Sequence, residues 1–267
     1  MTETAFHDNA VPGNPAGEPL PELDIPEPGK QNRLTVLLRL LLLIPQFIVL
    51  FVLGIVTFFV TIAGWFSALV LGRLPEPIER YLTNYLGYAT RVDASSMLVT
   101  DRYPPFSFGG TPDHPVQIEL VPHVRLNRLA VLFRIILMIP AGIVSYVVGA
   151  GWWVVAFLIW LVVLIMDRMP RPLFQATAAI LRFRMRMGAY TMMLTSSYPK
   201  RLFGDQSAAA AGTAPRSATR PLLLETGGKV LLVIFIVLGV LAAVGNGVQS
   251  GTADYDYKSP DTVSTLP

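Results

Sequence analysis

Two arginines, Arg39 and Arg134, lie within the first turns of long apolar segments. A charge at such a place costs free energy unless the side chain snorkels or finds a partner. The sequence allows three roles: contact with lipid phosphate at the interface, pairing with an internal carboxylate such as Glu76 or Asp167, and binding of an anionic ligand through the planar guanidinium fork. We predict the first role, because an arginine can reach the interface from one or two turns inside.

Four more arginines recur near the ends of the same segments. Arg73 and Arg168 each open an R-x-P-x-P motif, and Arg91 and Arg186 lie in the basic stretches that follow. Basic charge at a membrane surface attracts anionic lipid by about 1 kcal/mol per residue. The candidate lipid-phosphate or structural residues are therefore Arg39, Arg134, Arg73, Arg168, Arg91 and Arg186.

The sequence shows no catalytic or metal-binding constellation. Cysteine is absent, which excludes a disulfide, a thiolate nucleophile and a cysteine-based metal site. No Gly-rich phosphate loop, H-E-x-x-H or G-x-S-x-G motif occurs. Glu76 and Glu79 could form a carboxylate pair, but Arg171 and Phe174 stand at the corresponding places later in the chain. We expect no enzyme activity, no cofactor, no metal and no nucleic-acid partner.

The arginines recur because the chain contains a tandem duplication. Residues 32–109 match residues 127–204 at a constant offset of 95, with no insertion or deletion. Equivalent residues include Gly54 and Gly149, Trp65 and Trp160, Arg91 and Arg186, and Tyr103 and Tyr198. Both copies begin with N-R-L and carry I-P about three helical turns later, so the chain consists of two copies of one unit with additional ends.

The composition predicts an integral membrane protein. The chain is 52% hydrophobic and 15% charged, against about 25% charged residues in soluble domains. Its apolar residues gather in 40–72, 135–166 and 230–248, which contain no charged side chain. A helix of about 20 apolar residues is long enough to cross a bilayer.

The first apolar run has 33 residues and would form a helix of about 50 Å, longer than the roughly 30 Å hydrocarbon core. We therefore predict two spans per copy, joined by a turn at Gly54 in the first and at 149–151 in the second. The five predicted spans are 33–53, 57–72, 128–148, 152–167 and 229–248. Two spans per copy would make the copies parallel repeats. The alternative is one helix per copy, kinked at Pro45 and Pro140.

The distribution of basic residues predicts the orientation. If the N-terminus is cytoplasmic, all 21 basic residues except Lys258 lie on the cytoplasmic side, as the positive-inside rule requires. This places the C-terminus outside and predicts a multi-pass membrane protein.

The segment after each R-x-P-x-P motif has the apolar spacing of an amphipathic helix. We expect it to lie in the cytoplasmic interface with its arginines among lipid phosphates. In the second copy, residues 182–187 alternate as a strand would, so a strand stays open there. Short apolar and acidic stretches at 23–26 and 116–120 are candidate strands that could pair with each other.

These elements predict an all-α membrane protein of two tandem helical-hairpin repeats with cytoplasmic interfacial helices, two candidate strands and a C-terminal transmembrane helix. The predicted divisions are a disordered acidic, proline-rich cytoplasmic arm (1–21), repeat one (22–110), repeat two (111–205), a flexible linker (206–228), the fifth span (229–248) and an extracytoplasmic tail (249–267).

The motif R-L-x-x-L-[LF]-R-x-x-L-x-I-P, followed by W, R-x-P-x-P, R-V and D-R-Y-P-P-F, resembles an uncharacterised bacterial membrane-protein family catalogued as domain of unknown function 4389. The resemblance covers about 30–109 and 125–204. It implies a membrane fold in the bacterial plasma membrane and no known activity. The second copy ends differently, with Ser197-Tyr198-Pro199-Lys200, so a ligand role for the Asp101-Arg102 pair would belong to the first copy alone.

We expect a non-catalytic membrane protein that acts as a scaffold, an accessory subunit or a lipid-associated factor. Its expected partners are the bilayer, anionic lipids and another membrane protein. The alternative is a small-molecule or lipid transporter, or a transporter subunit, built from two parallel repeats. The predicted spans offer few polar groups for a pathway and no acidic residue, which weighs against proton or cation coupling.

Overall fold

The computed structural model describes residues 20–27, 29–205 and 216–256; side chains in the last helix are described as far as residue 245. The predicted arm up to residue 19, the linker residues 206–215 and the tail from 257 lie outside the described residues. The elements in chain order are β1 (Glu22–Asp24), α1 (Arg33–Leu37), α2 (Arg39–Leu71), α3 (Glu76–Ser96), β2 (Gln117–Glu119), α4 (Arg128–Leu132), α5 (Arg134–Val154), α6 (Ala156–Met166), α7 (Arg171–Thr191) and α9 (Thr226–Asp256).

Both repeats begin with the same helix cap. The side chain of Asn32 accepts a hydrogen bond from the Leu34 backbone N–H at 2.9 Å, and that of Asn127 accepts one from Leu129 at 3.0 Å. Asparagine is a preferred N-cap because it satisfies a free N–H of the first turn. Each short first helix then ends at a non-helical residue, Leu38 or Phe133, before the long apolar helix starts.

The predicted turn at Gly54 is wrong. The apolar run of repeat one forms a single helix, α2, which contains both Pro45 and Gly54. Helix α3 packs along the middle of α2, where the hydroxyl of Tyr81 donates to the carbonyl of Leu53 at 3.4 Å and the hydroxyl of Tyr85 faces Gly54. Gly54 therefore makes room for a neighbouring tyrosine rather than a turn.

In repeat two the chain does break, but not at the predicted place. Residues 149–151 stay inside α5, and the break comes at Val155 (φ −104°, ψ 7°) between α5 and α6. A Cβ built on Gly151 would overlap the carbonyl group of Phe235 in α9. Glycine is needed at residue 151 because two helices cross closely there, and not because the chain turns.

The segments after the R-x-P-x-P motifs are helices in both repeats, α3 and α7, and each starts directly after a proline (Pro75 or Pro170). The strand left open for 182–187 is thus not formed. The arginines expected among lipid phosphates are instead turned into the protein in α7, because this helix is enclosed by α3, α5, α9 and β1. Its arginines Arg182 and Arg186 are each only 1% exposed.

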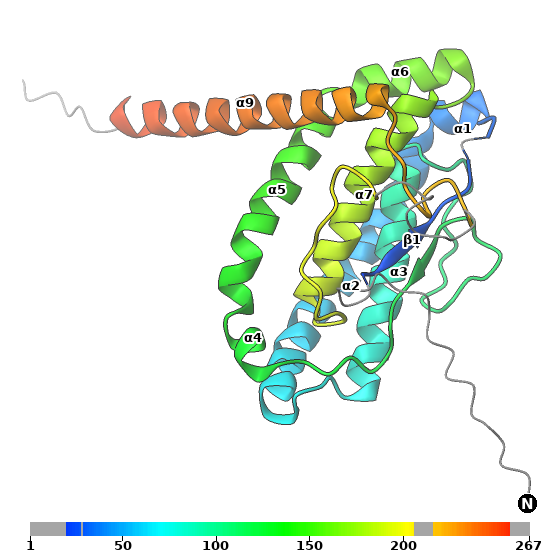
Figure 1. Cartoon of the computed structure of the whole chain (residues 1–267). Helices are drawn as coiled ribbons and strands as arrows, with labels where there is room; N and C mark the ends of the chain where they lie inside the picture. Colours follow the sequence, from blue (N-terminus) through cyan, green and yellow to red (C-terminus); the bar gives the residue numbers. More distant parts are fainter. Residues whose placement is uncertain (1–19, 28, 206–215, 257–267) are drawn as a thin grey trace, which may run out of the picture.

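The elements form three layers (Figure 1). The apolar helices α2 and α5 pack on α3 and α7 respectively, and α3 and α7 contact each other. On the other side of this middle pair lie β1 and β2, which contact α7 and α3. The predicted pairing of the two strands is confirmed: they are antiparallel, with Leu23 opposite Ile118.

Reciprocal contacts relate the repeats by an approximate two-fold axis. The indole N–H of Trp65 donates to the carbonyl of Val131 at 3.0 Å, and that of the equivalent Trp160 donates to the carbonyl of Val36 at 2.9 Å. The start of each repeat therefore packs on the end of the other, α1 on α6 and α4 on α2. It follows that α2 and the α5–α6 segment run in opposite directions.

Three of the described helices are long and apolar enough to cross a membrane: Arg39–Leu71, Arg134–Val154 and Thr226–Gly245. Helix α6 is apolar but shorter. The described part of the predicted linker is packed rather than loose: the buried hydroxyl of Thr219 donates to the carbonyl of Leu23 at 2.6 Å and accepts from the N–H of Ile25 at 2.8 Å. Helix α9 then begins at Thr226, slightly before the predicted span.

The two indole contacts give a first testable prediction. Replacing Trp65 or Trp160 with Phe removes one hydrogen bond and keeps most of the aromatic volume, so each variant should lose about 1 kcal/mol of unfolding free energy. Because the two junctions are separate, the double variant should lose the sum. Thermal unfolding in detergent measures both quantities. A loss from only one of the two variants would contradict the reciprocal arrangement.

Candidate functional site

Arg39 lies in a polar socket inside the protein and is 4% exposed. Its Nη1 donates to the carbonyl of Thr100 at 2.6 Å, and its Nη2 donates to Asp101 Oδ1 at 2.8 Å. The internal carboxylate considered from the sequence is therefore present, but it is Asp101 and not Glu76 or Asp167. The predicted contact of Arg39 with lipid phosphate is not what the structure shows.

Arg134 occupies the equivalent socket of repeat two with a different partner. Its Nη2 donates to the carbonyl of Thr195 at 2.6 Å, the counterpart of Thr100. Its guanidinium lies 4.1 Å from the ring centre of Tyr190, a favourable cation–π distance. Ser196 stands where repeat one has Asp101. Both arginines therefore donate to the carbonyl of the equivalent threonine, Thr100 or Thr195. In addition, Arg39 contacts a carboxylate, whereas Arg134 contacts an aromatic ring.

Arg91 and Arg186 are also buried and hold chain segments to the middle helices. Arg91 Nη2 donates to the carbonyl of Ser107 at 2.9 Å. Arg186 Nε donates to the carbonyl of Pro21 at 2.9 Å, next to β1. Burial, reinforced by the charge of Arg182, lowers the pKa of Arg186 to about 10, while burial raises the pKa of the neighbouring Glu22 carboxyl. These four arginines have structural contacts within the protein.

The most deeply buried ion pair among the described residues was missed from the sequence. Arg182 Nη1 lies 2.6 Å from Asp205 Oδ2, which also accepts the backbone N–H of Leu222 at 3.0 Å. Burial opposes ionisation of Asp205, but the charge and hydrogen bond of Arg182 hold the pKa of this carboxyl below its ordinary value. Repeat one has Gly87 at the position of Arg182, so the duplication gave no signal for the pair.

Arg73 and Arg168, the remaining two candidates, are exposed. Each follows a residue in the left-handed conformation that ends an apolar helix, Gly72 (φ 70°) or Asp167 (φ 57°). They lie where the chain leaves the apolar layer, and the lipid-phosphate role stays a prediction for these two.

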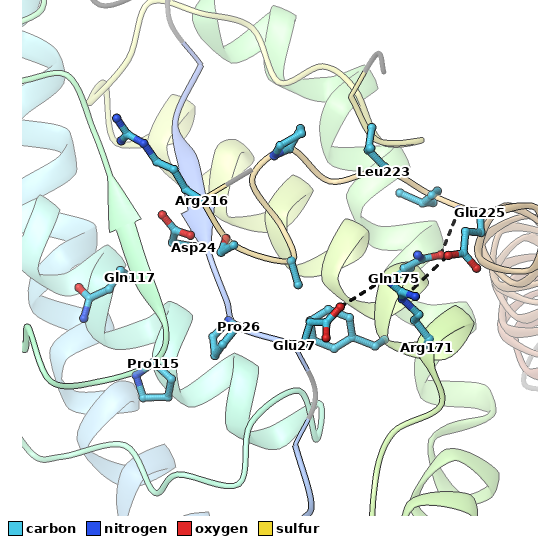
Figure 2. Close-up of a pocket in the computed structure, with 15 residues that line it drawn as sticks. Asp24, Pro26, Glu27, Pro115, Gln117, Arg171, Gln175, Arg216, Leu223 and Glu225 are labelled. Carbon is cyan, nitrogen blue, oxygen red and sulfur yellow. Dashed lines mark hydrogen bonds and ion pairs between the residues drawn. The ribbon is translucent and has the colours of Figure 1, made fainter. Parts of the chain in front are cut away.

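A large open cavity lies between the repeats and the base of α9 (Figure 2). Its volume is about 970 Å³. Asp24 and Gln117 line it from the strands, Arg171 and Gln175 from the start of α7, and Arg216 and Glu225 from the segment that leads into α9. The cavity is thus built from both repeats and from the chain that follows them.

The charges in this cavity are mixed and exposed. Arg171 lies 3.3 Å from Glu27 and 3.9 Å from Glu225, and the side chains of Arg171 and Arg216 are both 67% exposed. Exposed pairs of this kind contribute about 0–1 kcal/mol, so they can open to a ligand that brings charges of its own. Among the described residues, no group of three histidine or acidic side chains could hold a metal ion.

A family comparison agrees with the repeat boundaries. The model of the family described as Domain of unknown function (DUF4389) matches residues 33–107 and again 128–202, together more than half of the chain. The chain belongs to this family. Each DUF4389 unit contains the short first helix, the apolar helix and the middle helix. It also contains the following loop, whose backbone carbonyl accepts a hydrogen bond from Arg91 or Arg186. The strands, α9 and most of the cavity residues lie outside the DUF4389 matches.

No curated protein and no solved structure matches the chain.

Proposed function

We propose that this protein is a non-catalytic scaffold or accessory subunit of the bacterial plasma membrane, and that its cavity receives a segment of a partner protein. The observation that carries the proposal is the position of the cavity, which is built from both repeats and the base of α9. A partner bound there would contact all three parts of the chain at once. We propose that the N-terminus of the DUF4389 protein is cytoplasmic and its C-terminus extracytoplasmic, because this orientation places nearly all basic residues in the cytoplasm.

The chemistry of the cavity favours a polypeptide that carries both acidic and basic side chains. Arg171 and Arg216 can meet acidic residues, while Asp24, Glu27 and Glu225 can meet basic ones. The exposed Leu223 and Pro26 supply apolar contact between these charges. Mixed charge with an apolar centre is the composition expected of a protein interface.

The test is recovery of a partner from native membranes in mild detergent. The double variant Arg171→Glu and Arg216→Glu should lower the amount of a stoichiometric partner about fivefold or more, which corresponds to about 1 kcal/mol. A matched control makes the same Arg→Glu change at two exposed arginines outside the cavity, Arg80 and Arg125. This control should leave the recovery of the partner unchanged. Equal recovery with both double variants would refute the cavity as the binding place.

The transporter alternative rests on the two-fold arrangement of the repeats, which resembles that of carriers. The packing of the middle helices favours the scaffold, because a Cβ built on Gly188 of α7 would lie 2.9 Å from Leu86 of α3. Asp93 and Arg184 join the same two helices at 3.3 Å. Purified protein in liposomes should therefore show no solute flux above that of empty liposomes, and saturable flux would favour the transporter.

A further inference from the structure

Most of the exposed large apolar side chains of the described repeats lie on α2, α5 and α6, on one side of the layered fold. Phe51 and Phe59 on α2 and Phe157 on α6 are 71%, 64% and 68% exposed. On the opposite side the strand layer carries exposed charge, including Glu119 and Arg216. A soluble surface rarely exposes so large an apolar patch, so the helical side faces an apolar medium and the strand side faces water.

Helix α3 follows α2 along most of its length. The contacts between them, in order along α2, are Arg39 with Ser95, Gln46 with Tyr88, Leu53 with Tyr81 and Gly64 with Ile78. The strand pair lies on the far side of α3 and α7. Because Leu23 pairs with its own counterpart Ile118, the two-fold axis passes through the strands. The strands therefore lie midway between the two junctions that the tryptophans mark.

This position decides how α2 can lie in a membrane. If α2 stood along the membrane normal, the two junctions would lie at opposite faces and the strand pair would lie at mid-depth. Exposed Glu119 would then face lipid, at a cost of at least about 2.5 kcal/mol per charge. If α2 lies along the membrane plane, the strand layer is in water and the cost disappears. The two-fold axis is then parallel to the membrane normal.

Helix α9 runs in another direction, through the layers. It starts beside α7, where the N–H of Glu225 donates to Gln175 Oε1 at 3.0 Å, and it crosses α5 where Gly239 meets Val147. Figure 1 shows α9 projecting past α5 and away from β1. Its apolar stretch 230–248 is about 28 Å long, close to the roughly 30 Å of a hydrocarbon core.

We propose that α2 and α5–α6 lie within the cytoplasmic half of the bilayer, that they enter and leave it at the cytoplasmic face, and that α9 alone crosses. The occupant of the apolar face is lipid acyl chain. The ends of both apolar segments then lie at one membrane surface, which places Arg73 and Arg168 at the same depth, among lipid head groups. This arrangement replaces five crossings with one.

Labelling of single cysteines tests the proposal directly, because the chain contains no cysteine of its own. An impermeant maleimide is added to intact spheroplasts and then to permeabilised ones. Ser250→Cys should label from outside. Asp113→Cys should label only after permeabilisation, and Val56→Cys should not label from outside. Labelling of Val56→Cys from outside would overturn the proposal in favour of two spans per repeat. Labelling of Asp113→Cys from outside would overturn it in favour of an α2 that crosses the membrane once.

Spin labels measure the depth of α2 independently of labelling from either side. Nitroxides at the exposed residues Leu41, Phe51 and Phe66, in liposomes of phosphatidylcholine and phosphatidylglycerol, should lie at similar depths. A helix along the normal would separate the first and last by about 38 Å, which would overturn the proposal. High oxygen accessibility is expected at all three positions. Protection of the three from oxygen would mean that a second copy covers the face, which also overturns the assignment to lipid.

Discussion

The variant Gly239→Ala is expected to separate α9 from α5. A Cβ at this position would overlap the carbonyl group of Val147 in α5, and a Cβ at Gly151 would overlap the carbonyl group of Phe235 in α9. Both obstacles are backbone atoms, so no change of rotamer relieves them. We expect a loss of about 3 kcal/mol in unfolding free energy, the upper end for an overpacked site.

The matched control for this prediction is Gly245→Ala in the same helix, where a Cβ would meet nothing within 4 Å. There the higher helix propensity of alanine should stabilise the helix by about 0.5–1 kcal/mol. The two variants should therefore shift the unfolding temperature in detergent in opposite directions. With a specific protease site inserted at residue 209, the cleaved α9 fragment should stay with the repeats in the parent and the control but dissociate in Gly239→Ala. Retention in all three would show that the glycine contact does not hold α9.

Arg182→Met is expected to cost about 3–5 kcal/mol, because it leaves the carboxylate of Asp205 buried without its charge partner. The conversion of both residues, Arg182→Met with Asp205→Leu, should recover part of the loss, since an apolar pair of similar volume avoids the unpaired charge. The control Arg171→Met removes an exposed pair and should change the unfolding free energy by less than about 1 kcal/mol. Equal losses from Arg182→Met and Arg171→Met would contradict the role assigned to burial.

The same pair predicts a dependence on pH. Because the pKa of Asp205 is lower in the folded protein, its ionisation stabilises the fold fully above the unfolded pKa of about 3.9. This contribution is lost as the pH falls toward the lower folded value. The stability difference between the parent and Asp205→Asn should therefore be constant at neutral pH and shrink below about pH 4. A difference that persists at low pH would show that the pair acts through shape and not charge.

The sequence predicted those parts of the fold that depend on local or repeated signals. The helices after Pro75 and Pro170 and the pairing of the strands around Leu23 both follow from residues that recur at a fixed offset. The membrane character follows from uninterrupted apolar runs, and three of the described helices are long and apolar enough to cross a membrane.

Other parts could not be predicted, for physical reasons. A glycine such as Gly54 or Gly151 looks the same in the sequence whether it forms a turn or makes room for a neighbouring helix. Only the position of that neighbouring helix distinguishes the two cases. A uniformly apolar run has no polar face, so it does not reveal which side is buried. Arg39 meets Asp101, which is distant along the chain and has no acidic counterpart in repeat two. The cavity depends on residues outside the duplicated unit.

The crossed junctions have a consequence for the order of events during synthesis. When the ribosome has completed the first unit, the indole N–H of Trp65 has no acceptor, because Val131 has not yet been made. The carbonyl of Gly72 likewise has no donor, because Leu126 has not yet been made. Gln31 likewise waits for Asp167. The nascent first half must therefore remain at the insertion machinery, with its apolar helix shielded, until the second half emerges. A stalled chain that ends before residue 126 should be a preferred substrate for membrane quality-control proteases.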